Sequence, residues 1–280
     1  MTTDFPYRPV RYFAVAFVAT YVLWFAGAWA SFNAPALYMP FMLSGLLVPF
    51  VVSWAMVLAS GDRALKREHV KRLYDPRRLD TKTLPVFFLV MPVAVLISIV
   101  LSVGFGGSTD QFALAEGFSF STGAVPVLMV LFLAATLEEL GWRGYAFDSL
   151  ESRFGFVRAA LVFGVLWSLW HLPLILVKDS YQYELVQENA WFAVNFFVSI
   201  IPMGVIISWI CKKNGRSVFA TIVFHFIVNM SQEALAMTQT TKCIETGVLT
   251  LIAVGIVLAD QRPVRSDAEL KRMGRLAWNV

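Results

Sequence analysis

Long apolar runs separated by short polar segments form the dominant pattern of this chain. Eight runs can be drawn, at residues 12–32, 38–60, 84–104, 123–145, 158–178, 190–211, 217–236 and 247–259, the last being the shortest. A bilayer core about 30 Å thick requires about 20 apolar residues per helical crossing. The runs are continuous rather than alternating, which argues against a transmembrane β-barrel. The pattern predicts an all-α, polytopic integral membrane protein with eight transmembrane helices.

Composition supports a membrane location. Hydrophobic residues make up 58% of the chain and charged residues only 15%, whereas soluble domains are usually about 25% charged. We find no internal repeat, so we expect a single transmembrane domain over residues 1–259 and a basic cytoplasmic tail over residues 260–280.

The distribution of cations predicts the topology. If all eight runs cross the membrane, every one of the 23 Lys and Arg residues except Lys178 and Lys242 falls on one side. Cytoplasmic loops carry the positive excess, so both termini are expected in the cytoplasm. The basic segment 61–82 favours anionic lipid headgroups over nucleic acid as its partner. His69, within this segment, is interpreted as a surface residue.

A few ionisable and amide side chains lie inside the predicted spans, where they are costly and commonly mark function. They come from the fourth, fifth and seventh runs: Glu138, Glu139, Arg143, His171, His225 and Asn229. At a rise of about 1.5 Å per residue, the carboxylate, imidazole and amide groups can share one layer in the cytoplasmic half of the membrane.

Helical spacing separates two roles among these residues. Glu139 and Arg143 are four residues apart, with the acid first, which favours an ion pair along one helix. Glu138 is rotated by about 100° from its neighbour and has no such partner. His225 and Asn229 are also four residues apart and share a face. We therefore expect a structural pair beside a free carboxylate that faces the histidines and the asparagine.

A carboxylate and an imidazole around a water molecule can perform hydrolysis, because the carboxylate accepts the water proton. An amide donor such as Asn229 can stabilise the oxyanion. Glu138, His171 and His225 could instead bind Zn²⁺, since two histidines and one carboxylate form a known catalytic zinc set. The chain lacks the His-Glu-x-x-His motif, and the preferred interpretation requires no cofactor.

Three short motifs resemble those of a known family. "EELGWRG" at 138–144 resembles the Glu-Glu-x-x-x-Arg motif of the CPBP (Abi) intramembrane proteases, whose best-known members are the type II CAAX prenyl endopeptidases. "WSLWHLP" at 167–173 resembles the second motif, Phe-x-x-x-His, with Trp167 in the Phe position. "HFIVN" at 225–229 matches His-x-x-x-Asn. The likeness covers about residues 123–235, in the same order along the chain.

This resemblance implies a helical membrane fold with a cytoplasm-facing catalytic cavity. It assigns water activation to Glu138 and His171 and oxyanion stabilisation to Asn229. The remaining histidine of the motifs, His225, is counted with these three as a catalytic residue, and Glu139, Arg143 and Trp167 support the site. The family has often been labelled metalloprotease, but a glutamate-and-histidine mechanism needs no metal. The Trp167 departure concerns substrate fit more than chemistry.

The leading hypothesis is an intramembrane endopeptidase in a prokaryotic cell membrane, with its active site facing the cytoplasm. Its substrate would be a peptide or a protein, with or without a prenyl group. The cleavage would serve CAAX-like protein processing, bacteriocin maturation or self-immunity. Two alternatives remain: a transporter or proton relay that uses the same buried groups, and a non-catalytic immunity or scaffold protein. A transporter would more naturally show two related halves with broken helices, and the sequence shows no such repeat.

Overall fold

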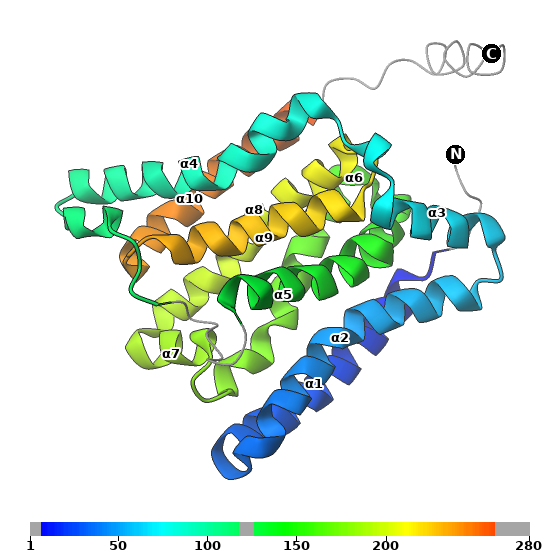
Figure 1. Cartoon of the computed structure of the whole chain (residues 1–280), viewed down its shortest axis with the longest axis horizontal. Coiled ribbons are helices and arrows are strands. Elements are labelled where there is room, and N and C mark those ends of the chain that lie inside the picture. The colour runs from blue at the N-terminus through cyan, green and yellow to red at the C-terminus, as the bar shows by residue number, and fades with distance from the viewer. Residues whose placement is uncertain (1–6, 118–125, 261–280) are drawn as a thin grey trace.

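Helices form the fold in the computed structural model, which describes residues 7–117 and 126–260 (Figure 1). The α-helices are α1 (Pro9–Asn33), α2 (Pro35–Ala59), α3 (Arg63–Tyr74), α4 (Leu84–Gly104), α5 (Val127–Gly141), α6 (Phe147–Trp170), α7 (Tyr181–Glu188), α8 (Ala190–Lys213), α9 (Val218–Ala234) and α10 (Gln239–Asp260). Within the described ranges the only β-type pairing is an isolated bridge between Leu114 and Leu235. The all-α prediction is confirmed.

In the part of the chain that the structure describes, six helical segments are long and apolar enough to cross a membrane. They are Pro9–Asn33, Pro35–Ala59, Thr81–Gly104, Val127–Leu176, Ala190–Lys213 and Gln239–Asp260. The fourth is 50 residues long and includes both α5 and α6, which correspond to the predicted spans 123–145 and 158–178. Helix α9, at the seventh predicted span, has 17 residues. The polytopic character is confirmed. The number of crossings stays a prediction. The basic tail also stays a prediction, because most of it lies outside the described residues.

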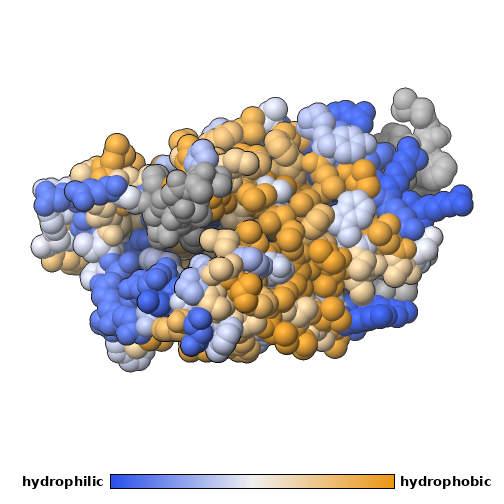
Figure 2. Space-filling model, turned by 60° about the horizontal axis from the view of Figure 1, so that its bottom comes forward, coloured by the Kyte–Doolittle hydropathy of each residue, from blue (hydrophilic) through white to orange (hydrophobic). Residues whose placement is uncertain are grey.

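The surface has the inverted character of a membrane protein. Figure 2 shows hydrophobic residues gathered over the middle of the molecule and hydrophilic residues at both ends. Large apolar side chains such as Val100 and Leu251 are exposed, while Glu139 and Arg143 are completely buried. Apolar side chains facing lipid are stable without protein contacts, whereas polar groups inside the membrane must find partners within the protein.

Helix α6 ends earlier than the predicted span 158–178. Its last residue is Trp170, His171 caps it, and a 3₁₀ segment, Leu172–Leu176, follows. Pro173 lacks an amide hydrogen and disfavours the helical conformation of the residue before it, so the α-helix stops there. His171 therefore lies at a helix end rather than within a helix.

The segment between the predicted runs 123–145 and 158–178 is largely helical. The five residues Trp142–Ala146 form a π-helical turn that joins α5 directly to α6. The helical geometry of α6 is interrupted at Gly155, whose φ of 70° lies in the left-handed region that glycine adopts readily. The first motif therefore continues from α5 into the π-turn without a loop between them.

Helix α10 is longer than the predicted run 247–259 because its first turns are polar. Thr241 and Glu245 are buried, and Glu245 accepts a hydrogen bond of 2.8 Å from Gln232 of α9. Apolarity alone therefore underestimated the length of this helix.

Helix α3, the start of α6 and the turn between α8 and α9 lie together at one end of the bundle. Figure 1 shows α3 at this end and α7 at the other. Arg72 of α3 forms an ion pair with Asp148 and donates to the backbone carbonyl of Arg216 in the α8–α9 turn. The interpretation of His69 as a surface residue is wrong: its side chain is only 2% exposed, because α3 packs against the π-turn.

Candidate active site

Two adjacent carboxylates lie in the last turn of α5. Glu138 is 7% exposed and Glu139 is 0% exposed. Since successive residues of a helix point about 100° apart, the two side chains meet different partners. Glu139 contacts Arg143 and His225, whereas Glu138 contacts Trp167.

Glu139 is the centre of a buried charged group. Nη1 of Arg143 lies 2.9 Å from Oε1 of Glu139, which is the ion pair that the spacing predicted. Nδ1 of His225 lies 3.0 Å from the same oxygen. Because a carboxylate only accepts, Nδ1 of His225 carries the proton and Nε2 keeps its lone pair. The guanidinium carbon of Arg143 lies 4.3 Å from the centre of the Phe163 ring, within cation–π range.

The position of His225 differs from the predicted arrangement. We expected both histidines to face Glu138, but the ring of His225 is hydrogen-bonded to Glu139. An ionised carboxylate that is already paired with Arg143 can accept a second donor, since its oxygens together offer about four lone-pair sites. The ring of His225 also packs edge-on against Trp167, with centroids 5.4 Å apart.

Trp167 connects the first two motifs. Its indole Nε1 donates a hydrogen bond of 2.9 Å to Oε2 of Glu138. Among the residues that the structure describes, no hydrogen bond to Oε1 of Glu138 is found. One carboxylate oxygen is thus held by the protein, and the other is left to interact with a water or a substrate.

His171 lies four residues after Trp167, at the end of α6. Its Nδ1 is 2.8 Å from the carbonyl oxygen of Trp167, so Nδ1 donates and Nε2 is the unprotonated nitrogen of the neutral ring. The ring packs against Trp170 and Phe196. Glu138 lies within electrostatic range of it. The tautomer and orientation of His171 are therefore both fixed by the end of the helix.

Asn229 follows His225 by one turn of α9 and is partly exposed. Within the described parts of the chain, its side chain makes no hydrogen bond. The structure thus gathers Glu138, His171 and His225 around Trp167 and leaves Asn229 beside them on α9, with its amide uncommitted.

Zinc dependence stays a prediction, and the described residues show no ready ligand cluster for it. No group of three or more His, Cys, Asp or Glu side chains in residues 7–117 and 126–260 is placed to hold a metal ion. The alternative set of Glu138, His171 and His225 therefore does not form a ligand cluster. His225 is directed to Glu139 instead of joining the other two.

The role of Trp167 as a hydrogen-bond donor was missed at the sequence level. Trp167 was treated as an aromatic substitute for the motif phenylalanine. An indole differs from a phenyl ring by one N–H donor, and this donor is the group that reaches Glu138. The signal in the sequence is the identity of residue 167: a tryptophan at the motif position of phenylalanine adds an N–H group that can bind the Glu138 carboxylate.

The fold and the site together define a multi-pass helical membrane protein that holds carboxylate and imidazole groups between its helices. Comparisons with known proteins then give the family. A family model described as type II CAAX prenyl endopeptidase Rce1-like matches residues 120–231. A protein from Methanococcus maripaludis named CAAX prenyl protease 2 is 52% identical over 264 residues, which cover 94% of this chain and 97% of that protein.

This chain therefore belongs to the type II CAAX prenyl endopeptidase family. The resemblance seen in the three motifs is confirmed, and all three motifs fall inside the matched region. Membership makes the protein a protease with a protein or peptide substrate.

Proposed function

We propose that this protein is an intramembrane endopeptidase that hydrolyses a peptide bond with a water molecule activated by Glu138 and His171. The observation that carries the proposal is the hydrogen bond of 2.9 Å from Trp167 to Glu138. It orients a buried carboxylate, leaves one of its oxygens unbonded by described residues, and places it near the neutral ring of His171.

The chemical steps follow from these orientations. Oε1 of Glu138 accepts a proton from water while Nε2 of His171 accepts the second O–H as a hydrogen bond, so that the water oxygen is directed. This oxygen then bonds to the carbonyl carbon of the substrate. When the C–N bond breaks, Glu138 returns its proton to the leaving nitrogen. The amide of Asn229 donates to the oxyanion that forms on the carbonyl oxygen.

The second carboxylate has a supporting role in this proposal. Glu139 accepts from both Arg143 and His225 through Oε1 and is completely buried, so we assign it a supporting role and give the role of base to Glu138, which is slightly exposed. Glu139 also fixes the tautomer of His225, whose Nε2 is then directed away from Glu139 and can bind the substrate. The mechanism uses residues of this chain alone and requires no cofactor.

For the substrate we propose a prenylated protein with a C-terminal CAAX sequence, cleaved at the cytoplasmic face of a prokaryotic membrane. The name of the Methanococcus protein supports the prenyl class. Membrane embedding agrees with it, because prenylation of the CAAX cysteine brings a soluble protein to the bilayer. The charge distribution supports the cytoplasmic orientation.

The test is a cleavage assay on the full chain in liposomes, with a farnesylated CAAX peptide and the same peptide without the farnesyl group. We expect cleavage of the farnesylated peptide and a loss of roughly 10²–10⁴-fold in kcat for Glu138→Gln, the range for general acid–base catalysis. Glu188→Gln, at an exposed position of α7, is the matched control. A folded Glu138→Gln protein that cleaves at the wild-type rate would overturn the catalytic role.

Two further arms separate the remaining hypotheses. Equal cleavage of both peptides would overturn the prenyl preference but leave the endopeptidase. Incubation with a strong chelator separates the metal-free mechanism, which predicts retained activity, from a zinc mechanism, which predicts loss.

A further inference from the structure

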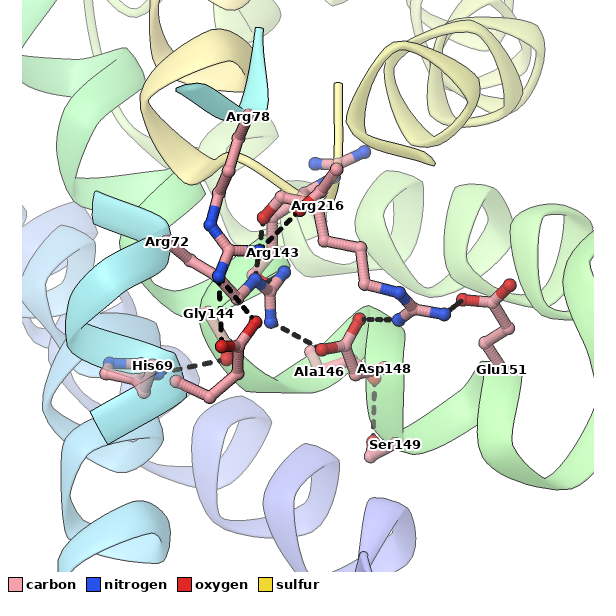
Figure 3. Close-up of polar contacts among 12 residues, drawn as sticks. His69, Arg72, Arg78, Arg143, Gly144, Ala146, Asp148, Ser149, Glu151 and Arg216 are labelled. Atoms are coloured by element: carbon pink, nitrogen blue, oxygen red, sulfur yellow. Dashed lines mark hydrogen bonds and ion pairs between the residues drawn. The ribbon is translucent and has the colours of Figure 1, made fainter. Parts of the chain in front are cut away.

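Helix α3 packs against the first motif from a distant part of the chain (Figure 3). Its buried residues are Leu65, His69 and Arg72, which lie on one face because they are spaced by four and three residues. The segment was expected to contact lipid headgroups, and this face contacts the protein instead. Two of its side chains reach the π-turn Trp142–Ala146.

Two carbonyl groups of the π-turn accept hydrogen bonds from side chains of α3. A π-helix bonds residue i to residue i+5, as the amide of Phe147 does with the carbonyl of Trp142. The next two carbonyls accept from α3: Nη2 of Arg72 lies 2.6 Å from the Arg143 oxygen, and Nδ1 of His69 lies 3.1 Å from the Gly144 oxygen.

Arg72 uses all of its guanidinium nitrogens in this way. Nε donates to the carbonyl of Arg216 at 2.6 Å, and Nη1 forms an ion pair with Asp148. The other oxygen of Asp148 accepts from the side chain of Arg216, which also binds Glu151. The side chain of Arg72 is 4% exposed. Its rigid fork therefore joins α3, the π-turn and the α8–α9 turn, a geometry that the point charge of lysine cannot reproduce.

We infer that Arg72 is a positioning residue for the catalytic carboxylate, Glu138. It holds the backbone oxygen of Arg143, and the side chain of Arg143 in turn holds Glu139. Glu138 directly precedes Glu139 in the last turn of α5. A shift of about 1 Å in a reacting group costs about 10²-fold in rate, so a loosened π-turn lowers kcat. The inference rests on the proposed function.

The test compares Arg72→Lys with Arg77→Lys. Arg77 is a matched control because it lies in the same basic segment, forms an ion pair with the neighbouring Asp75 and is 85% exposed. Three quantities are measured on each full-length protein: kcat and KM on the farnesylated peptide in liposomes, Tm, and hydrogen exchange of peptides covering residues 138–147.

For Arg72→Lys we expect a folded protein with a moderately lower Tm, because a cation still faces Asp148 but the carbonyls of Arg143 and Arg216 lose donors. We expect kcat to fall about 10-fold or more with KM unchanged, and exchange in 138–147 to increase. Arg77→Lys should change none of these. A folded Arg72→Lys protein with wild-type kcat and wild-type exchange overturns the inference, and so does an increase confined to KM.

A second variant covers failure of Arg72→Lys to fold. Asp148→Glu keeps the counter-charge of Arg72 and Arg216 but moves it by one methylene group, so a smaller fall in kcat, roughly 5-fold for about 1 kcal/mol, is expected with KM unchanged. No fall in kcat overturns the inference. If the wild type does not cleave the farnesylated peptide, the proposed function fails. Exchange then decides the structural part alone: greater exchange in Arg72→Lys than in Arg77→Lys supports it, and equal exchange overturns it.

Discussion

The indole Nε1 of Trp167 donates a hydrogen bond of 2.9 Å to Oε2 of Glu138. The two residues are 29 positions apart in the chain and belong to different motifs on successive helices. The contact sets the rotation of the Glu138 carboxylate and determines which oxygen is left for water. The backbone carbonyl of the same tryptophan fixes His171, so one residue orients both groups that the proposed mechanism requires.

Trp167→Phe removes the donor and keeps an aromatic ring. A hydrogen bond to a charged group contributes about 1.5–3 kcal/mol, so we expect kcat to fall about 10–100-fold with little change in KM or Tm. Trp24→Phe is the control, because it removes an indole hydrogen bond to Met42 on α2. If Trp167→Phe and Trp24→Phe have equal kcat, the hydrogen bond does not position Glu138.

Glu138→Gln and Glu139→Gln should differ in kind. Glu138→Gln keeps an oxygen for the Trp167 donor, so we expect normal thermal stability together with a loss of roughly 10²–10⁴-fold in kcat. Glu139→Gln leaves the fully buried Arg143 without its counter-charge, and breaking a buried pair costs about 3–5 kcal/mol. We expect a clearly lower Tm for this variant. The comparison is made by thermal unfolding in detergent and by the cleavage assay; equal stability of the two proteins would contradict the division of roles.

Much of the fold was predictable because apolar runs of membrane length have few alternative structures. The run 84–104 coincides with α4, Leu84–Gly104. Prediction was weaker where helix ends depend on polar residues. The first turns of α10 are helical through burial of Thr241 and Glu245, and apolarity does not report such contacts. Direct continuation of α5 into α6 through a π-turn is likewise set by tertiary contacts with α3.

The candidate site was predictable only along single helices. The Glu139–Arg143 pair follows from a spacing of four residues, and the structure contains it. Which carboxylate His225 binds depends on how α9 is rotated against α5, which the sequence does not encode locally. The burial of His69 depends in the same way on the docking of α3. Contacts between helices were therefore the part that sequence patterns left open.

Protein stability should depend on the protonation of His69 at mildly acidic pH. Burial lowers the pKa of His69 below its usual value of 6.5, and the nearby Arg72 lowers it further. The hydrogen bond to Gly144 and the nearby Asp148 act in the opposite direction without cancelling the shift. The unfolded chain therefore binds a proton at a higher pH than the folded protein does, and stability decreases as the pH falls below 6.5. We expect the Tm difference between pH 7.5 and pH 5.5 to be smaller in His69→Gln than in the wild type. Identical differences would show that His69 does not contribute.

The close approach of α5 to α2 gives the last prediction. A Cβ atom at Gly141 would lie 2.5 Å from the backbone carbonyl carbon of Pro49, and this backbone cannot move without displacing α2. Overpacking of this kind costs about 1–3 kcal/mol. We therefore expect Gly141→Ala to lower the Tm and, because Gly141 lies two residues after Glu139 and three after Glu138, to lower kcat as well. Gly247→Ala on α10 is the control, since nothing lies within 4 Å of its Cβ position. Equal Tm values for the two variants, measured in the same detergent, would show that α2 and α5 do not meet at Gly141.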